Sequence, residues 1–522
     1  VGKRTGVAAD GETGGGGIAC LPSVAGLPPV ACGSAQNPVR QKPMMAASAQ
    51  IPAATAISPV KRFLAATCWL LAAGCAQLPN AGQSTGPGYP QRVEIDGARG
   101  ALSSQRVSAI LAGLNRNAGD LDILQQHVAT EQAIVGSPLT AGNSVHLLQD
   151  GAATYPAMFS AIGAATDHVN LESYIIEDDE IGRQLSELLL QKRSQGVHIN
   201  VIYDSVGSIG TPKAFFDRLR AGGVQVLEFN PVNPLSAKRG WLINNRDHRK
   251  LLVVDGHTAF VGGINFSRVH SGGSAARRRP ADAYRVAAND AGRTAWRDTH
   301  LRIEGPVVDD FQKLFIQTWE KQGGAPLAMA NYFPPLAAKG SEMVRAIGST
   351  PDDPHSLIYL TLISAISKAE RRVYLTNAYF VPDPQLLQAL GDAARRGVDV
   401  QLLLPGQSDS GVAFNAGRSH YSTLLRAGVK IHERHDVMLH AKSATVDGVW
   451  SCVGSTNLDW RSFLHNDEID ATILGRDFAR QMEAVFATDI SESEDIDLGK
   501  WEARSLDLRV KEWGARMWEY WL

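Results

Sequence analysis

The sequence predicts an α/β protein of two pseudo-symmetric α/β/α domains, each with a mixed, mostly parallel sheet flanked by helices. The first observation is an internal duplication, in which the twenty residues from His248 align without a gap to the twenty from His440, with eight identities. The second is that apolar, strand-like runs alternate with amphipathic segments of helix length in both halves. The third is a length of 522 residues, which is enough for two domains with sizeable cores.

Both halves are predicted to contain the same elements in the same order: strand, helix, strand, helix, strand, then a hairpin, then a strand and a helix. In the first half, the acidic run 177–180 precedes an amphipathic segment that ends near Gly196. Acidic residues favour the positive end of a helix dipole, so we interpret this run as a helix start and not as a metal site. The matching segments are 168–204 and 372–406, 215–229 and 421–434, and 299–319 and 467–486.

Shifts in composition predict the domain boundaries. The Pro- and Gly-rich stretch 323–341 is typical of a boundary between domains. We expect a linker and N-terminal helical region at 76–139, a first domain at 140–335, a second domain at 340–490 and a Trp-rich amphipathic tail at 491–522.

Residues 1–75 are expected to be a disordered stretch followed by a lipoprotein-type signal peptide. Lys61 and Arg62 precede the apolar run 63–74, which is too short to span a bilayer well but fits the apolar core of a signal peptide. The sequence LAAGC resembles the bacterial lipobox, in which Cys75 would be lipidated. A plain secretory signal or a short buried helix is the alternative interpretation.

The duplicated segment places a histidine and a lysine together in each half. Residues two apart on a strand face the same side, so His248 and Lys250 project together, as do His440 and Lys442. A single His-x-Lys pair on a strand is usually a solvated face. Two copies in register, each followed by Asp and Asn at the same offsets, favour a functional site.

An Asp-Gly pair follows each His-x-Lys pair and predicts a hairpin turn. Asp255 and Asp447 occupy the turns, so we expect them to support the structure more than the chemistry, although they belong to the repeated motifs. The return strands would carry Asn265 and Asn457 back toward the His-x-Lys pairs.

Two such half-sites suit a phosphodiester. Lysine and carboxamide groups can neutralise the non-bridging oxygens, while one imidazole attacks phosphorus and the other protonates the leaving alkoxide. The sequence has no HExxH motif, Cys cluster or carboxylate set with ligand spacing, so we expect no metal and no other cofactor. A formal net charge of −2 makes nucleic acid an unfavoured partner.

The pattern H-x-K-x4-D-x6-G-[GS]-x-N, present twice, resembles the phospholipase D superfamily. The segments GGIN, WRDTHLRIEGPVV and HAKSATVDGVWSCVGSTNLDWRSFLHNDE are similar to those of bacterial cardiolipin synthases, and the similarity covers about residues 140–522. The resemblance implies two phospholipase D-like domains and a covalent phosphohistidine intermediate that an alcohol or water resolves.

The resemblance also implies roles for the motif residues, with His248 as nucleophile and His440 as general acid and base. It further implies a carboxylate after each motif that orients a histidine, for which Glu468 and Asp298 are the candidates. The implied catalytic motif residues are His248, Lys250, Asp255, His440, Lys442 and Asp447, and the implied phosphate ligands are Lys250, Asn265, Lys442 and Asn457.

The expected activity is a phosphatidyltransferase that makes cardiolipin from phosphatidylglycerol. Three alternatives stay open: hydrolysis of phospholipids to phosphatidic acid, a nuclease, and a non-catalytic lipid-binding lipoprotein. The expected partners are phospholipid substrates and a membrane surface, and the sequence does not decide the oligomeric state.

The tail concentrates Trp501, Trp513, Trp518 and Trp521 among basic residues, which favours a helix in a membrane interface over one docked on the domain. We therefore expect a bacterial cell-envelope protein that is membrane-associated and lipid-anchored at Cys75. The run 277–279 (RRR) is interpreted as solvated. Four further histidines have no repeated context and receive no role: His270, His420, His432 and His435.

Overall fold

The computed structural model describes residues 78–79, 94–114, 126–129, 132, 134, 139–233, 242–272, 295–353 and 356–522, all within the compact unit Cys75–Leu522. The predicted signal peptide, Cys75 and the run 277–279 lie outside these residues. Among the described residues, no helix is both long enough and apolar enough to cross a membrane.

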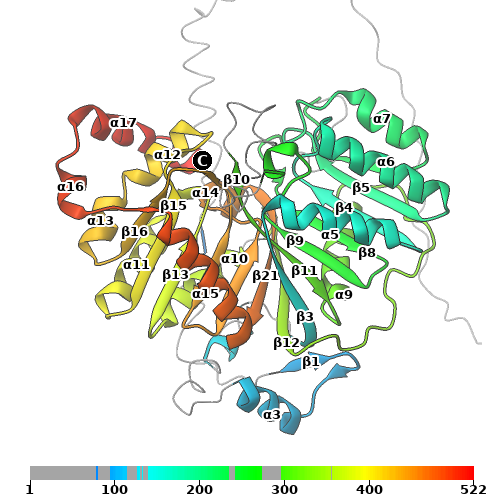
Figure 1. The fold of residues 1–522 in the computed structure, drawn as a ribbon, viewed down its shortest axis with the longest axis horizontal. Coiled ribbons are helices and arrows are strands. Elements are labelled where there is room, and N and C mark those ends of the chain that lie inside the picture. Colours follow the sequence, from blue (N-terminus) through cyan, green and yellow to red (C-terminus); the bar gives the residue numbers. More distant parts are fainter. Residues whose placement is uncertain are drawn as a thin grey trace, which may run out of the picture. The chain divides into compact units, whose positions relative to one another are not determined.

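The first half contains a mixed sheet whose strands are hydrogen-bonded in the order β6–β5–β4–β8–β9–β11–β3 (Figure 1). These strands are β3 (Leu139–Gln149), β4 (His168–Ser173), β5 (His198–Asp204), β6 (Gln225–Phe229), β8 (Lys250–Val254), β9 (Thr258–Gly262) and β11 (Thr299–Glu304).

The second half repeats this order as β16–β15–β13–β18–β19–β21–β12. The strands are β12 (Glu342–Ser349), β13 (Arg372–Thr376), β15 (Asp399–Pro405), β16 (Lys430–Arg434), β18 (Ser443–Val446), β19 (Trp450–Gly454) and β21 (Asn466–Leu474). Strands β3 and β12 pair antiparallel, so the two sheets are continuous at their inner edges.

The duplication is therefore visible strand by strand, and the predicted mixed α/β fold is confirmed. The strands that alternate with helices run parallel, namely β4–β5–β6 and β13–β15–β16. The hairpins and the strands that follow them pair antiparallel. The parallel share of each sheet is thus smaller than the alternating pattern predicted, because the hairpin strands occupy the part of the sheet next to the other half.

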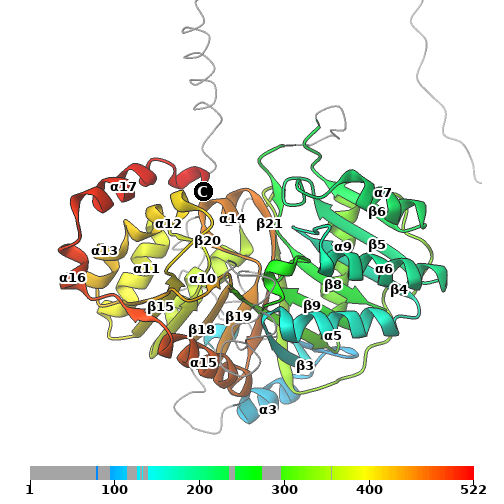
Figure 2. The same cartoon turned by 45° about the horizontal axis from the view of Figure 1, so that its top comes forward.

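Helices cover both faces of the sheets (Figures 1 and 2). The first half has α5 (Asp150–Ala164), α6 (Glu180–Ser194), α7 (Lys213–Ala221) and α9 (Val308–Lys321). The second half has α10 (Leu357–Lys368), α11 (Pro384–Arg395), α12 (Gly411–Arg418), α13 (Tyr421–Arg426), α14 (Trp460–Leu464) and α15 (Arg476–Ser491).

Helix α6 confirms the predicted helix start at the acidic run, because the Asp179 carboxylate accepts a hydrogen bond from the Gly182 N–H and caps the helix.

One apolar core belongs to both halves. Helix α9 contributes Phe311, Phe315 and Trp319 to it, and α15 contributes Phe478 and Met482. The same cluster includes inward-facing residues of β9, β11, β19 and β21. Because this core is shared, the two halves hold each other at a defined distance, and the polar residues at its edge are positioned with it.

The tail forms α16 (Leu498–Glu502), α17 (Leu506–Arg516) and the short 3-10 helix η5 (Glu519–Trp521). Figure 2 shows α17 lying over α12. Trp501 is only 5% exposed and packs against Tyr421, whereas Trp513 and Trp518 are 68% and 58% exposed. The prediction of membrane contact is therefore wrong for Trp501, which the domain covers, and stays a prediction for the exposed tryptophans.

Candidate active site

A cavity of about 410 Å³ lies between the two halves and contains residues of both repeated motifs. His248 and Asn265 line it from the first half, and His440 and Asn457 line it from the second. These four side chains are nearly buried in the fold. The two half-sites that the sequence predicted thus share one cavity.

Two short parallel ladders bring the motifs together. Strand β7 (Arg246–Asp247) pairs with the start of β21, and the His248 N–H donates to the Asp467 carbonyl at 2.9 Å. Strand β10 (Trp296–Arg297) pairs with β17 (Met438–Leu439) in the same way, and the His440 N–H donates to the Arg297 carbonyl at 2.8 Å. Each histidine is therefore anchored by backbone of the opposite half.

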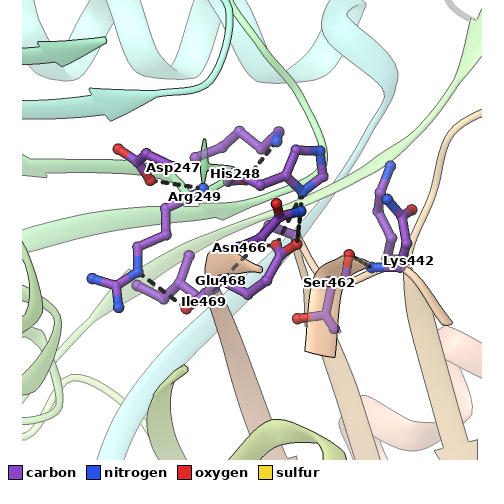
Figure 3. Close-up of polar contacts among 12 residues, drawn as sticks. Asp247, His248, Arg249, Lys442, Ser462, Asn466, Glu468 and Ile469 are labelled. Atoms are coloured by element: carbon purple, nitrogen blue, oxygen red, sulfur yellow. Dashed lines mark hydrogen bonds and ion pairs between the residues drawn. The ribbon is translucent and has the colours of Figure 1, made fainter. Parts of the chain in front are cut away.

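The carboxylates that contact the histidines are exchanged between the halves. His248 Nδ1 lies 3.0 Å from both carboxylate oxygens of Glu468, and Figure 3 shows the two side chains pointing at each other. His440 Nδ1 lies 2.7 Å from Oδ2 of Asp298. Glu468 and Asp298 each follow one motif in sequence, yet each contacts the histidine of the other motif.

Each carboxylate is also held in place by other hydrogen bonds. Glu468 accepts from the Ser455 hydroxyl and, at 3.1 Å, from the Asn466 amide. Asp298 Oδ1 accepts from the Thr299 N–H at 2.8 Å. Glu468 is fully buried, and this burial raises its pKa. The charge of Lys250 and the hydrogen-bond donors around the carboxylate oppose that rise.

The surroundings lower the pKa of both imidazoles. Burial first, and then the charges of Lys250 and Lys442, lower the pKa of His248 well below its usual range. The pKa of His440 is lowered in the same way by burial and by Lys442 and Lys250. With each Nδ1 directed at a carboxylate, each Nε2 is the ring nitrogen left for a reacting group.

The two lysines are buried beside their histidines. Lys250 Nζ donates to the His248 carbonyl at 2.5 Å, and Lys442 Nζ donates to the His440 carbonyl at 2.5 Å. Burial, partly offset by Glu468, lowers the pKa of Lys250 to about 7. Burial, partly offset by Asp298, lowers the pKa of Lys442 to about 8. An anionic ligand in the cavity would favour the charged form of both.

Asp255 and Asp447 lie at the hairpin turns and not among the cavity-lining residues. Both have a left-handed backbone, with φ of 51° and 54°. Asp255 accepts three backbone N–H bonds, from Thr166 at 2.8 Å and from Asp167 and His168 at 2.9 Å. Burial alone would raise its pKa, but these donors hold it below the usual range.

Asp447 accepts the equivalent bonds from the backbone N–H groups of residues 370–372. These contacts tie each hairpin to the strand beside it, which places both aspartates as supports of the fold.

Arg461 and His270 are among the residues that sequence reasoning did not assign to the site. Arg461 lines the cavity, and its guanidinium is held by Asn244, with Nη1 3.0 Å from Oδ1. Val269 occupies the matching position of the first half, so a search for repeated residues could not find Arg461. His270, which received no role, lies in η3 (Arg268–His270) with Nδ1 3.5 Å from Asp298 Oδ2.

The tail also lines the cavity. Trp521 and Leu522 line it, and the Arg461 N–H donates to the Leu522 main-chain oxygen at 2.7 Å. Tyr520 packs against Trp460. The tail is therefore part of the site as well as of the surface.

Among the described residues, one group has the side chains and spacing to hold a metal ion, namely His270, Asp298 and His440. It shares two members with the site itself, and the expected phosphoryl chemistry uses no metal.

Comparison with known proteins agrees with this architecture. Residues 158–271 and 362–490, one segment in each half, match the family described as "Cardiolipin synthase, PLD-like domain". The chain is 35% identical over 384 residues to the cardiolipin synthase of Geobacillus sp. (strain WCH70), covering 73% of each chain. It is 36% identical over 386 residues to cardiolipin synthase A of Pseudomonas putida (strain W619), covering 73% of this chain and 74% of the relative.

The fold is also that of a solved structure. The phosphatidylserine synthase of Haemophilus influenzae Rd KW20 superposes with a TM-score of 0.56 at 12% identity, covering 77% of this chain and all of the other. The match to a PLD-like domain in each half places the protein in the phospholipase D superfamily. Within it, the chain belongs to the cardiolipin synthase family.

Proposed function

We propose that this protein is a phosphatidyltransferase that converts two molecules of phosphatidylglycerol into cardiolipin and glycerol. The proposal is supported by family membership and by one observation above all. Two histidines share a cavity, and each has its Nδ1 directed at a buried carboxylate from the opposite half. That arrangement leaves two equivalent Nε2 atoms for one phosphodiester, as a two-step displacement requires.

In the first step, His248 Nε2 attacks phosphorus and the bond from phosphorus to the glycerol oxygen breaks. His440, which enters this step protonated on Nε2, gives that proton to the oxygen, so glycerol leaves and a phosphatidyl-histidine remains. Proton donation of this kind contributes roughly 10²–10⁴-fold. In the second step, a terminal hydroxyl of the second phosphatidylglycerol gives its proton to His440 and attacks phosphorus, which releases His248.

The neighbouring groups have supporting roles in this mechanism. Glu468 stabilises the positive charge that develops on His248, and Asp298 does the same for His440. Asn265, Asn457 and Arg461 are suited to the non-bridging oxygens because they line the cavity and carry no negative charge. Lys250 and Lys442 lie next to the cavity-lining histidines, and we assign them to the same oxygens.

Product analysis tests the activity. Purified protein is incubated with phosphatidylglycerol labelled in the phosphate, and the lipids are separated. We expect cardiolipin with one glycerol released per cardiolipin formed. Phosphatidic acid as the sole product would replace transfer by hydrolysis, and a His248→Asn variant with full activity would refute the mechanism.

We also propose that the surface around the cavity rests on a membrane. Exposed apolar side chains occur in the first half and in the tail: Ile209, Leu242 and Ile243 in the first half, and Trp513, Met517 and Trp518 in the tail. Gly207, near Ile209, lines the cavity, as does Trp521 of the tail. A lipid substrate would then reach the histidines without leaving the bilayer surface.

Vesicle flotation tests this contact. A Trp513→Ala/Trp518→Ala variant should bind phosphatidylglycerol vesicles more weakly than the wild type. Met329→Ala is the matched control, because Met329 is 99% exposed but belongs to the loop that packs on Gly256, at the end of β8 away from His248. Equal loss in both variants would contradict the assignment.

Lipid anchoring at Cys75 is a separate proposal, supported by the LAAGC sequence after a short apolar run. Mass spectrometry of the protein from host membranes should find an acylated Cys75. An intact, unmodified 61–80 segment would exclude the anchor.

A further inference from the structure

His270 lies against the Asp298–His440 pair without taking part in its hydrogen bond. Its side chain is 1% exposed, and its Nδ1 is 3.5 Å from the same Asp298 oxygen that His440 Nδ1 contacts at 2.7 Å. Within the described part of the chain, neither ring nitrogen of His270 has a hydrogen-bond partner. A buried polar group without a partner is costly and unusual, so this ring has unused binding capacity.

The three side chains provide a set of metal donors. One ring nitrogen of His270, one of His440 and one carboxylate oxygen of Asp298 lie within 4.8 Å of one another. Bonds of about 2.0–2.1 Å in a tetrahedral zinc site put neighbouring ligand atoms about 3.4 Å apart. The distances from Asp298 Oδ2 to Nδ1 of His440 and to Nδ1 of His270, 2.7 and 3.5 Å, bracket that spacing. Two imidazoles and one carboxylate are also a donor set that zinc uses in proteins.

Among the described residues, the other half has no equivalent group. The position that matches His270 in the duplication is Ser462, whose hydroxyl lies next to Glu468. The His248–Glu468 pair therefore operates beside a serine, so the chemistry shared by the two half-sites does not require an imidazole at this place. A serine also cannot complete a nitrogen-rich donor set, so the cluster occurs in one half-site only.

We propose that His270, Asp298 and His440 bind one Zn²⁺, or a similar transition-metal ion, and that bound metal reversibly inhibits the enzyme. A metal in this position takes over a nitrogen of His440 and the oxygen of Asp298 that faces it. His440 then loses the contact that orients it and cannot exchange a proton with the substrate oxygen. The inhibition rests on the proposed function, whereas the binding does not.

Cobalt titration tests the binding without reference to activity. Chelator-treated protein is titrated with Co²⁺, and the visible absorption of tetrahedral Co²⁺ is recorded. We expect one site per chain in the wild type and its loss in His270→Gln. His168→Gln is the matched control, because His168 is equally buried but lies on β4 and contacts Asp167 and Gln312. It should bind Co²⁺ as the wild type does.

Inhibition is measured in the phosphatidylglycerol assay. Zn²⁺ should inhibit the wild type and EDTA should restore activity, while Mg²⁺, which prefers oxygen ligands, should have no effect. Loss of an outer-shell partner alone costs about 10–100-fold in metal affinity, so loss of a ligand in His270→Gln should raise the inhibitory Zn²⁺ concentration at least about tenfold.

The outcomes separate the two proposals. Absence of a one-to-one tetrahedral Co²⁺ spectrum in the wild type overturns the site, even if His270→Gln fails to fold. Equal Zn²⁺ sensitivity of His270→Gln and wild type also overturns it. A His270-dependent Co²⁺ spectrum in a protein that forms no cardiolipin keeps the site and refutes the proposed function.

Discussion

Replacing Glu468 by glutamine removes the negative charge beside His248 and keeps the size of the side chain. The carboxylate is completely buried and lies 3.0 Å from His248 Nδ1. When His248 Nε2 bonds to phosphorus, the imidazole becomes positively charged, and the carboxylate is the group that stabilises this charge. The variant therefore tests the transition state and not the binding of lipid.

The expected effect can be worked from the distance. Two unit charges about 4 Å apart attract by about 4 kcal/mol at an effective dielectric constant of about 20. A loss of about 4 kcal/mol corresponds to a decrease of about 10³-fold in rate. We expect Glu468→Gln to lower kcat for cardiolipin formation by about this factor, with little change in KM.

The measurement uses labelled phosphatidylglycerol in mixed micelles, with rapid denaturation to trap label on the protein. Asp470→Asn is the matched control, since Asp470 is buried on the same strand and the same face but accepts from Ser455 and Thr456 and contacts no histidine. Both variants should show the thermal unfolding of a folded protein. If Glu468→Gln keeps kcat within about threefold of the wild type, the electrostatic role of the carboxylate is refuted.

Three further predictions concern the motifs themselves. A lipid with a p-nitrophenyl leaving group needs no proton donor, because p-nitrophenolate leaves without protonation. With this substrate, His440→Asn should regain activity, measured as release of p-nitrophenol, and His248→Asn should not. Rescue of both variants, or of neither, would contradict the assigned roles. Lys250 is charged below its pKa of about 7 and neutral above it, so kcat/KM should fall as pH rises through about 7. Lys250→Arg should move that fall to higher pH, and an unchanged profile would assign the titration to another group. Asp255→Ala removes the acceptor of three backbone N–H groups and should lower the free energy of unfolding by about 3 kcal/mol in thermal or urea denaturation, while activity per folded molecule stays within about threefold. The same is expected of Asp447→Ala, and inactive folded protein would make either residue catalytic.

Much of the fold could be predicted because its signals are local or repeated. The alternation of apolar runs with amphipathic segments is set by the periods of strands and helices. The gapless match from His248 to His440 predicted that each half repeats the other, and the strand orders of the two sheets agree. The smaller parallel share was not predictable, because the partner of a hairpin strand depends on contacts between segments far apart in sequence.

The sequence by itself determined which residue types each half supplies: one histidine, one lysine, one asparagine and a later carboxylate. It also indicated that Asp255 and Asp447 form turns, since Asp-Gly favours the left-handed backbone that both adopt.

Only the tertiary structure decided which carboxylate serves which histidine. The pairing of β7 with β21 and of β10 with β17 carries Glu468 to His248 and Asp298 to His440. The same long-range packing brings His270 to Asp298 and the tail to the cavity. These contacts join residues far apart along the chain, and their geometry is set by the core that the two halves share, which no local pattern encodes.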